Sequence, residues 1–294
     1  MNYFLYDAAG GKWELPAPLW VTLKKDEDAP ADSLTAEFPL SGLVPSAAFL
    51  RAEEDETVWF DGILDTMRSS YAASNLLAVS ARSRAALLLD SEALPAIYEN
   101  PSLGFLYQQH AAPYGFHGIN GNSEPFTGEY AVEKGSSEWQ ALDGFCREFL
   151  KEPLREENGL LTAEPIPERE PFYLGENGIP CLQVSQTKNL CRMLSETWAI
   201  DGTCWKRMNW DEGLEEHGFL RRKLCKVPDE TFKVARRQAE SISVLCAGWP
   251  QVQIYQTAFL QFQKKLQKMQ ISGIRYQLSS RGKTTRLMLR PEIT

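Results

Sequence analysis

The patterns that define many enzyme and membrane protein classes are missing from this sequence. It contains no Walker loop, no GxSxG, no HExxH and no GxGxxG following a strand-like segment, so the usual signatures of nucleotide binding, serine hydrolysis and zinc peptidase chemistry are absent. No run approaches the roughly 18 apolar residues that cross a bilayer, and the N-terminal MNYFLYDAAGGKWEL lacks a basic segment followed by an apolar core. We therefore expect no membrane insertion, and we expect the chain to stay in the compartment where it is made.

Histidine and paired cysteine motifs are equally scarce. The chain has only three histidines, His110, His117 and His217, and its six cysteines show no CxxC spacing. Structural zinc sites need closely placed Cys and His ligands, so we expect no metal centre. We interpret the cysteines as reduced, small apolar packing residues of a cytosolic protein, and a disulfide between Cys181 and Cys191 across a hairpin is the one pairing left open. The six are Cys146, Cys181, Cys191, Cys204, Cys225 and Cys246.

Length and composition indicate a soluble globular protein. The 294 residues are 43% hydrophobic and 24% charged, which suffices for two domains with a small third one, each with its own core. The net charge of −8 hides an asymmetry. Residues 229–294 carry eleven Lys and Arg against four Asp and Glu, a net +7, which leaves −15 on residues 1–228. An acidic body excludes nucleic acid or an anionic membrane as the main partner.

The basic residues near the C-terminus are spread over strand-like and turn-like sequence without stacking aromatics between them. We interpret them as solvated strand faces that meet an acidic neighbour or sister subunit, in preference to a nucleic-acid site. They are Lys264, Lys265, Lys268, Arg275, Arg281, Lys283, Arg286 and Arg290.

The first hundred residues are typical of a small barrel or sandwich. Apolar or alternating runs at 20–23, 33–38, 49–52 and 57–65 are separated by Gly, Pro and Asp clusters, and 75–82 supplies a closing strand. Gly62 inside the clearest strand, VWFDGILD, predicts a bulge or bend.

A strand, a stop and a short apolar helix follow in residues 75–106. Ser83 is positioned to cap a helix from Arg84 to Leu89, whose AALLL segment must be enclosed because it has no polar face. Pro95 ends this apolar run, because proline cannot extend a helix. Asn100 followed by Pro101 predicts the N-terminus of a second helix, or of two short ones, that extend to Tyr114. Residues 118–128 have the composition of a loop.

The strongest helix signal lies at 135–153. Ser137 and Gln140 have the spacing of a capping box, and Pro153 ends the segment. One apolar stripe runs along it at helical spacing, which predicts a core-facing helix. The stripe consists of Trp139, Leu142, Phe145, Cys146, Phe149 and Leu150.

The C-terminal half is typical of strands and hairpins. Asn158-Gly159 introduces a strand, 172–174 and 182–184 form an expected pair, and Asp201-Gly202 is a strong two-residue turn. Asp229 is placed to cap a helix from 229 to 245. A strand at 252–255 follows, and 271–278 and 284–289 form a final antiparallel pair.

Two acidic clusters are the candidate sites, and each has a simpler interpretation. Asp61 and Asp65 are four residues apart in one strand, so both point to one side and could mimic a catalytic carboxylate pair. The alternative, which we favour, is a solvent-facing edge. The segment DEGLEEHG, with Glu212, Glu215, Glu216 and His217, could bind metal, but we favour a charged loop or helix end. We assign no catalytic, cofactor or metal residues and expect no enzyme.

The order of several motifs resembles the baseplate hub proteins of contractile-tailed bacteriophages. The pattern RSRAALLLDSEALPAIYENPSL is followed by HAAPYGF at His110, and the strand FDGILD and the helix SSEWQAL stand where that family has similar segments. The family contains the late control protein D and the Mu baseplate hub, and the likeness is strongest to hub proteins of prophages in Gram-positive bacteria. One glycine is displaced from the family pattern between residues 190 and 265.

The resemblance implies a β-dominated α+β fold with two small β-barrel domains and a small helix-containing domain between them. We expect a first barrel at 1–97, a small α/β linking domain at 98–165, and a second barrel with an inserted helix at 166–294. It further implies a structural hub that as a homotrimer joins a six-fold tail tube to a three-fold spike, assembled in the bacterial cytoplasm and then part of the virion. The alternative is a tail component that binds the host cell wall or hydrolyses peptidoglycan.

Overall fold

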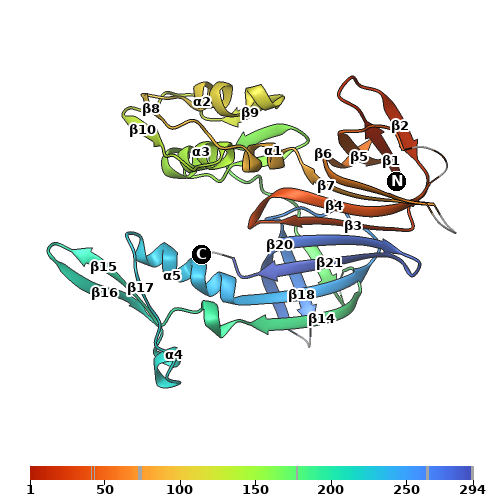
Figure 1. Cartoon of the computed structure of the whole chain (residues 1–294). Coiled ribbons are helices and arrows are strands. Elements are labelled where there is room, and N and C mark those ends of the chain that lie inside the picture. Colours follow the sequence, from red (N-terminus) through yellow and green to blue (C-terminus); the bar gives the residue numbers. More distant parts are fainter. Residues whose placement is uncertain (41, 43, 72–74, 177, 263–264, 293–294) are drawn as a thin grey trace. The chain divides into compact units, whose positions relative to one another are not determined.

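The computed structural model describes residues 1–40, 42, 44–71, 75–176, 178–262 and 265–292, and it is a β-dominated α+β structure. The described residues form two compact units. The first comprises Met1–Pro167 and Arg275–Lys283, and the second comprises Glu168–Ile274 and Thr284–Thr294. Within these residues strands far outnumber helices, as the alternation in the sequence predicted (Figure 1).

An antiparallel run of strands in the order β3-β4-β7-β6-β5-β1-β2 builds the first part of unit 1. All five strand segments expected from the sequence fall within it. Every second residue points inward, so Leu23, Leu34 and Leu50 are fully buried. The strands are Asn2–Tyr6, Lys12–Leu15, Trp20–Asp26, Ala29–Pro39, Phe49–Glu54, Thr57–Ser70 and Leu76–Ser83, numbered β1 to β7.

The bulge predicted at Gly62 lies elsewhere in β6. Gly62 is paired regularly with Leu50 on one side and Ser83 on the other. The register shifts occur on either side of it, between the pairs at Ala52 and Glu53 and between those at Leu64 and Thr66. Gly62 is needed for close backbone approach, because a β-carbon there would overlap the carbonyl oxygen of Arg82.

Helix α1 (Ala85–Asp90) is present, but Ser83 does not cap it. Ser83 is the last residue of β7, and Arg84 occupies the N-cap position without a side-chain hydrogen bond to the helix. The ladder with β6 extends to Ser83, so the strand takes the residue that local spacing assigned to the cap. Ala85, Ala86 and Leu88 are buried, as a helix without a polar face requires.

Asn100 also differs from its predicted role. Helix α2 (Leu103–His110) is capped by Ser102, whose hydroxyl accepts a hydrogen bond from the Phe105 N–H. Asn100 has a φ of 46°, and its backbone N–H and side-chain Oδ1 both bond to Gly128. These bonds close the small sheet of β8 (Ala96–Glu99) and β10 (Glu129–Val132). Asn100 therefore ends a strand pair, whereas the sequence had predicted that it begins a helix. A single 3-10 turn, Ala112–Tyr114, follows α2 as expected.

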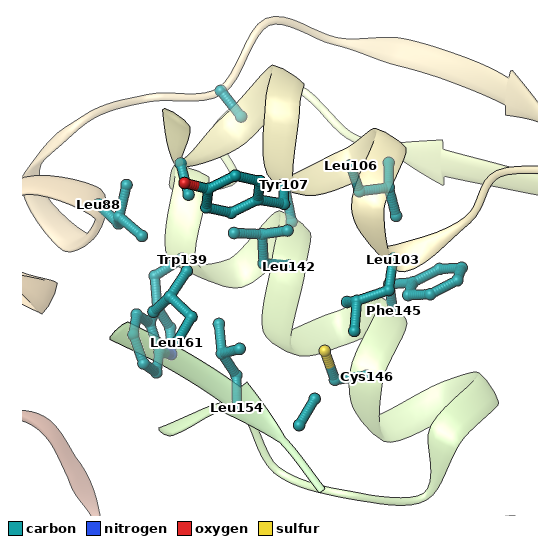
Figure 2. Packing of buried hydrophobic residues seen from close by; sticks show 14 of the residues in the cluster. Leu88, Leu103, Leu106, Tyr107, Trp139, Leu142, Phe145, Cys146, Leu154 and Leu161 are labelled. Atoms are coloured by element: carbon teal, nitrogen blue, oxygen red, sulfur yellow. The ribbon is translucent and has the colours of Figure 1, made fainter. Parts of the chain in front are cut away.

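The capping box is confirmed in helix α3 (Glu138–Phe145). The Ser137 hydroxyl accepts from the Gln140 N–H, and the Gln140 side chain accepts from the Ser137 N–H. A π-helical turn, Cys146–Leu150, continues α3 and ends before Pro153. The apolar stripe of α3 packs on α1, α2 and nearby strand residues (Figure 2). This cluster includes Leu88, Leu103, Leu106, Tyr107, Trp139, Leu142, Phe145, Cys146, Leu154 and Leu161.

Residues 118–128 are not wholly a loop. Gly118–Gly121 forms β9, which pairs in parallel with β12 (Leu160–Ala163). Composition did not predict this strand because β9 consists mostly of small and polar residues, with the sequence GING. The adjoining β11 (Arg155–Glu157) and β12 form the hairpin predicted from Asn158-Gly159, and both turn residues have positive φ.

Unit 2 contains an antiparallel run β14-β18-β21-β20 and a parallel pair β13-β19. The pair predicted between 172–174 and 182–184 is therefore wrong. β13 joins a strand more than eighty residues later, and β14 joins β18. The final hairpin of β20 and β21 is confirmed. Strand bounds are Phe172–Gly175, Cys181–Lys188, Glu240–Ala247, Thr257–Phe262, Lys265–Ser279 and Gly282–Arg290 for β13, β14, β18, β19, β20 and β21.

Two further predictions in this unit need correction. Helix α5 spans Pro228–Ala239, with Val227 at the N-cap and Asp229 in its first turn. The residues from 240 on leave the helix and form β18, because Ile242 and Val244 alternate into the core and pair with β14 and β21. Residues 252–255 form a turn-containing segment where a strand was expected, and β19 begins at Thr257.

Candidate assembly surface

Asp61 and Asp65 do lie on one side of β6, where arginines engage both. The guanidinium of Arg82 binds Asp65 through two nitrogens, at 2.8 and 2.9 Å, and reaches Asp90 at 2.6 Å. Arg84 Nε lies 3.0 Å from Asp61 Oδ2. These pairs tie β6 to β7 and to the end of α1, so the two carboxylates stabilise a strand–helix corner.

Arg82 also sets the charge state of Asp90. Hydrogen bonds from its guanidinium lower the pKa of Asp90, and they raise the pKa of Arg82 itself. A carboxylate held in its charged form by a bidentate arginine accepts hydrogen bonds but is a poor proton donor at neutral pH. This arrangement fits a structural role for the cluster and gives no geometry for general acid catalysis.

The acidic segment DEGLEEHG forms a short helix, α4 (Glu212–Glu216). Asp211 caps it by accepting from the Leu214 N–H, and His217 Nδ1 lies 2.6 Å from the Gly213 carbonyl oxygen. Glu215 pairs with Arg207. In the part of the chain that the structure describes, these side chains do not converge on a common point where a metal ion could bind.

A buried polar cluster in unit 1 was not foreseen. His110 Nδ1 on α2 lies 2.5 Å from Glu138 Oε2 on α3, and Tyr98 Oη lies 3.2 Å from His110 Nε2. Tyr114 donates to the second Glu138 oxygen at 3.1 Å. Burial and the Glu138 charge raise the pKa of Tyr98. No local spacing brings Tyr98, His110 and Glu138 together, since the contact depends on how α2 packs on α3. The cluster links the two helices through satisfied polar groups.

The basic residues near the C-terminus are partly paired within the chain. Lys268 lies 2.7 Å from Glu292, and Lys283 lies 3.3 Å from Glu54. Arg286 donates to the Ser243 hydroxyl at 3.1 Å. Lys264 lies outside the described residues. Of the remaining members, Lys265, Arg275 and Arg281 are exposed, which agrees with solvated strand faces, and Arg290 is half-buried.

A three-stranded sheet in unit 2 carries two exposed tryptophans, Trp205 and Trp210. Its strands are β15 (Glu196–Asp201), β16 (Cys204–Trp210) and β17 (Arg222–Leu224), with β15 in the centre. We call this sheet the arm. The two-residue turn that joins β15 to β16 is Gly202-Thr203, one residue later than the predicted Asp201-Gly202. The arm extends away from β14, β18 and β21 of the same unit (Figure 1).

Helix α5 covers one face of the arm. The Thr197 hydroxyl donates to the Pro228 carbonyl oxygen, and Asn209 Nδ2 donates to Asp229 at 2.8 Å. Thr197 and Asn209 are register partners, so their side chains share this inner face. Their neighbours Trp198 and Arg207, also partners, point to the opposite outer face.

The outer face of the arm combines exposed apolar side chains with arginines. Ile200 and Trp205 are register partners and are 64% and 49% exposed, and Leu224 on β17 is 54% exposed. The Arg222 guanidinium lies 4.7 Å from the Trp198 ring, and that of Arg207 lies 5.3 Å from Trp210. Tryptophan, isoleucine and arginine on one flat surface have the composition of a protein interface core.

Glu196 fixes the two arginines of this face. Its carboxylate lies 2.5 Å from Arg222 Nε and 3.1 Å from Arg207 Nε. Partial burial favours the protonated form of Glu196, but Arg222, Trp198 and Arg207 outweigh it and lower the pKa of the carboxyl. The arginines are therefore held over the tryptophan rings in a preorganised arrangement. Sequence spacing does not reveal this face, because Trp205 and Trp210 are five positions apart and regular alternation places them on opposite sides of a strand. The register shift beside Trp198 brings them to the same side.

The fold was compared with known proteins. No family model and no curated protein matches the sequence. The structure matches a 43 kDa tail protein of prophage MuSo2 from Shewanella oneidensis with a TM-score of 0.79 at 14% identity, over 98% of this chain and 97% of that one. A tail protein from Neisseria meningitidis MC58 gives 0.77 at 16% identity, over 99% and 97%. Prophage tail protein gp18 from Listeria monocytogenes EGD-e gives 0.62 at 10% identity, over 100% and 95%.

The chain thus has the fold of prophage tail proteins. The resemblance read from the motif order is confirmed at this level, including a tail protein of a Listeria prophage. The described helices include none that is long and apolar enough to cross a membrane.

Proposed function

We propose that this protein is a structural component of a bacteriophage or prophage tail and acts as the baseplate hub. The observation that carries the proposal is the extent of the fold match, which includes nearly the whole of this chain and nearly the whole of two prophage tail proteins. The motif order of residues 55–150 supports the assignment to the hub among tail proteins.

We further propose the domain plan implied by the motifs: a small β-barrel at 1–97, a linking domain at 98–165 and a second small β-barrel at 166–294. The β3-β4-β7-β6-β5-β1-β2 run and the β14-β18-β21-β20 run supply the strands. A duplicated barrel allows three copies to present six similar surfaces. Such a homotrimer contacts a six-fold tail tube on one side and a three-fold spike on the other.

The outer face of the arm supports a role in assembly. Exposed Trp205 and Ile200 contribute no burial energy to a monomer, whereas an interface buries them and the arginines beside them. We propose this face as a contact with a neighbouring subunit or tail protein. The acidic clusters of the chain are engaged in intramolecular pairs, which supports a structural role in preference to an enzymatic one.

Size-exclusion chromatography with light scattering tests the proposal. A trimer has a mass of about 100 kDa, three times that of the 33.2 kDa chain. We expect this mass either for the protein alone or after addition of the spike protein of the same tail, because weak trimers are completed by their neighbours. A monomer that persists in the presence of the spike contradicts the hub. Release of soluble peptides from purified cell wall by the protein alone would support the hydrolase instead.

A further inference from the structure

Two cysteines that are distant in sequence face each other across a strand pair of unit 2. Cys181 at the start of β14 is the register partner of Cys246 near the end of β18. Partners in an antiparallel pair have Cα atoms about 4.5 to 5.5 Å apart and side chains on the same face. A disulfide requires a Cα separation of about 4.4 to 6.8 Å. The register therefore pairs the two residues within the Cα range that a disulfide needs, beside a register shift between Cys181 and Gln183.

The two thiols have different surroundings. Cys246 is fully buried, and its Sγ donates to the Thr285 carbonyl oxygen at 3.4 Å. Cys181 is half-buried and lies in the edge strand of this run of strands. Burial raises the pKa of Cys246 to about 11, and the proximity of Cys181 adds to that rise. Cys181 is therefore close enough to influence the ionisation of Cys246.

We propose that Cys181 and Cys246 form a cross-strand disulfide when the protein passes from the reducing cytosol to an oxidising medium. The passage rests on the proposed function, since a tail protein leaves the cell in which it is made. The bond itself rests on the register of β14 and β18. Cys181 is the residue that a small oxidant reaches first, because Cys246 is enclosed.

The reaction is thiol–disulfide exchange with a low-molecular-weight disulfide such as glutathione disulfide. The Cys181 thiolate attacks one sulfur of the oxidant, forms a mixed disulfide and releases one glutathione thiolate. The Cys246 thiolate then attacks the Cys181 sulfur, forms the protein disulfide and releases the second glutathione. The protein loses two electrons and two protons, and the oxidant gains them as two glutathione thiols.

The location of the bond gives it a mechanical consequence. The segment between the two cysteines contains the whole arm together with α5, and the arm leaves the ladder at the pair Lys188–Glu240. A pull on the arm opens β14 from β18 one pair at a time from that end. Cys181 and Cys246 lie at the opposite end of the ladder, so a covalent bond there stops the opening before β14 detaches from the sheet.

Oxidation of the full-length protein with glutathione disulfide at pH 8.5 tests the bond. We expect a mass loss of about 2 Da, a cross-linked peptide pair containing Cys181 and Cys246, and a rise of about 5 to 10 °C in the unfolding temperature. The reaction should be faster at pH 8.5 than at pH 7, because both thiols are protonated at neutral pH. Cys181→Ser and Cys246→Ser should each abolish the mass loss, and Cys191→Ser should leave it unchanged.

A stable glutathione adduct on Cys181 without the cross-link, in protein that remains folded by circular dichroism, would overturn the proposal. These readouts are independent of the oligomeric state, so a failed trimer assay and a failed disulfide are distinguishable. Mapping the thiols of assembled tails recovered from the culture medium tests the compartment. A cross-link there supports the proposal, and free thiols in those tails overturn it.

Discussion

A β-carbon at Gly62 would overlap the backbone carbonyl oxygen of Arg82 on the neighbouring strand. We predict that Gly62→Ala destabilises the protein by about 1 to 3 kcal/mol, because β6 and β7 must separate to admit the methyl group. Gly104→Ala is the matched control. Gly104 lies in α2 with open space around it, and removing a helical glycine should stabilise by about 0.5 to 1 kcal/mol. Urea unfolding followed by circular dichroism measures both, and equal effects would contradict the argument.

Leu88 tests the enclosed position of α1. Its side chain is fully buried in the cluster shown in Figure 2. Leu88→Asp should prevent unit 1 from folding, because it places an unpaired charge in an apolar core, and Leu88→Ala should cost about 2 to 5 kcal/mol. Leu94→Asp is the control, since Leu94 is 83% exposed and should tolerate the charge. Thermal unfolding measures the melting temperatures. Equal melting temperatures for Leu88→Asp and Leu94→Asp would refute the enclosed position of α1.

Glu156 predicts a pH dependence of stability. Burial raises the pKa of Glu156 above its ordinary value of 4.5, despite a hydrogen bond from the Gly159 N–H at 2.7 Å. As the pH rises from 4.5 to the higher folded value, the unfolded chain releases a proton that the folded chain retains, so stability falls over that window. Glu156→Gln should remove this loss and raise the melting temperature at pH 7, while little changes below pH 4.5. A melting temperature at pH 7 that falls on this substitution would contradict the sign.

The arm should affect assembly without affecting folding. Ile200 and Trp205 are exposed partners, so the double substitution Ile200→Ser with Trp205→Ser should change stability by less than about 0.5 kcal/mol. It should weaken the trimer, or the complex with the spike, by at least tenfold, because it removes the centre of the apolar face. Tyr71→Ser is the control, as Tyr71 is also exposed but lies in unit 1. Analytical ultracentrifugation gives the affinities, and equal losses from both variants would argue against the arm.

Salt tests the charge asymmetry of the sequence. If the basic C-terminal region meets an acidic surface of a neighbour, raising the salt from low to molar concentration should weaken assembly, because the Debye length shrinks from about 10 Å at 0.1 M to about 3 Å at 1 M. Light scattering across a salt series measures this. Assembly that is insensitive to salt would assign the contact to apolar surfaces such as the arm.

Local rules predicted the features that local chemistry decides. The capping box at Ser137 and the turn at Asn158-Gly159 were found where their short spacing placed them, and the turn predicted at Asp201-Gly202 lies one residue later, at Gly202-Thr203. The strand alternation in residues 20–82 was also sufficient, since each strand there pairs with an antiparallel neighbour and buries one face.

Errors arose where distant residues decide the outcome. The segment after Ala239 satisfies helical spacing as well as strand alternation, and its pairing with β14 and β21 selects the strand. Ser83 does not cap α1, because it pairs with β6 as the last residue of β7. The candidate assembly surface also depends on contacts between residues that are distant in sequence. The sequence did not predict the shared face of the arm tryptophans, because it depends on the register shift in β16, and their exposure depends on α5 covering only the other face.

The parallel pairing of β13 with β19 has a consequence for synthesis. Residues 172–175 leave the ribosome with no partner, and 257–262 must emerge before that ladder can form. β14 waits in the same way for β18. Loop closure over such separations is slow, so unit 2 completes its fold only when nearly the entire chain has been released, and its unpaired strands are open to chaperones until then.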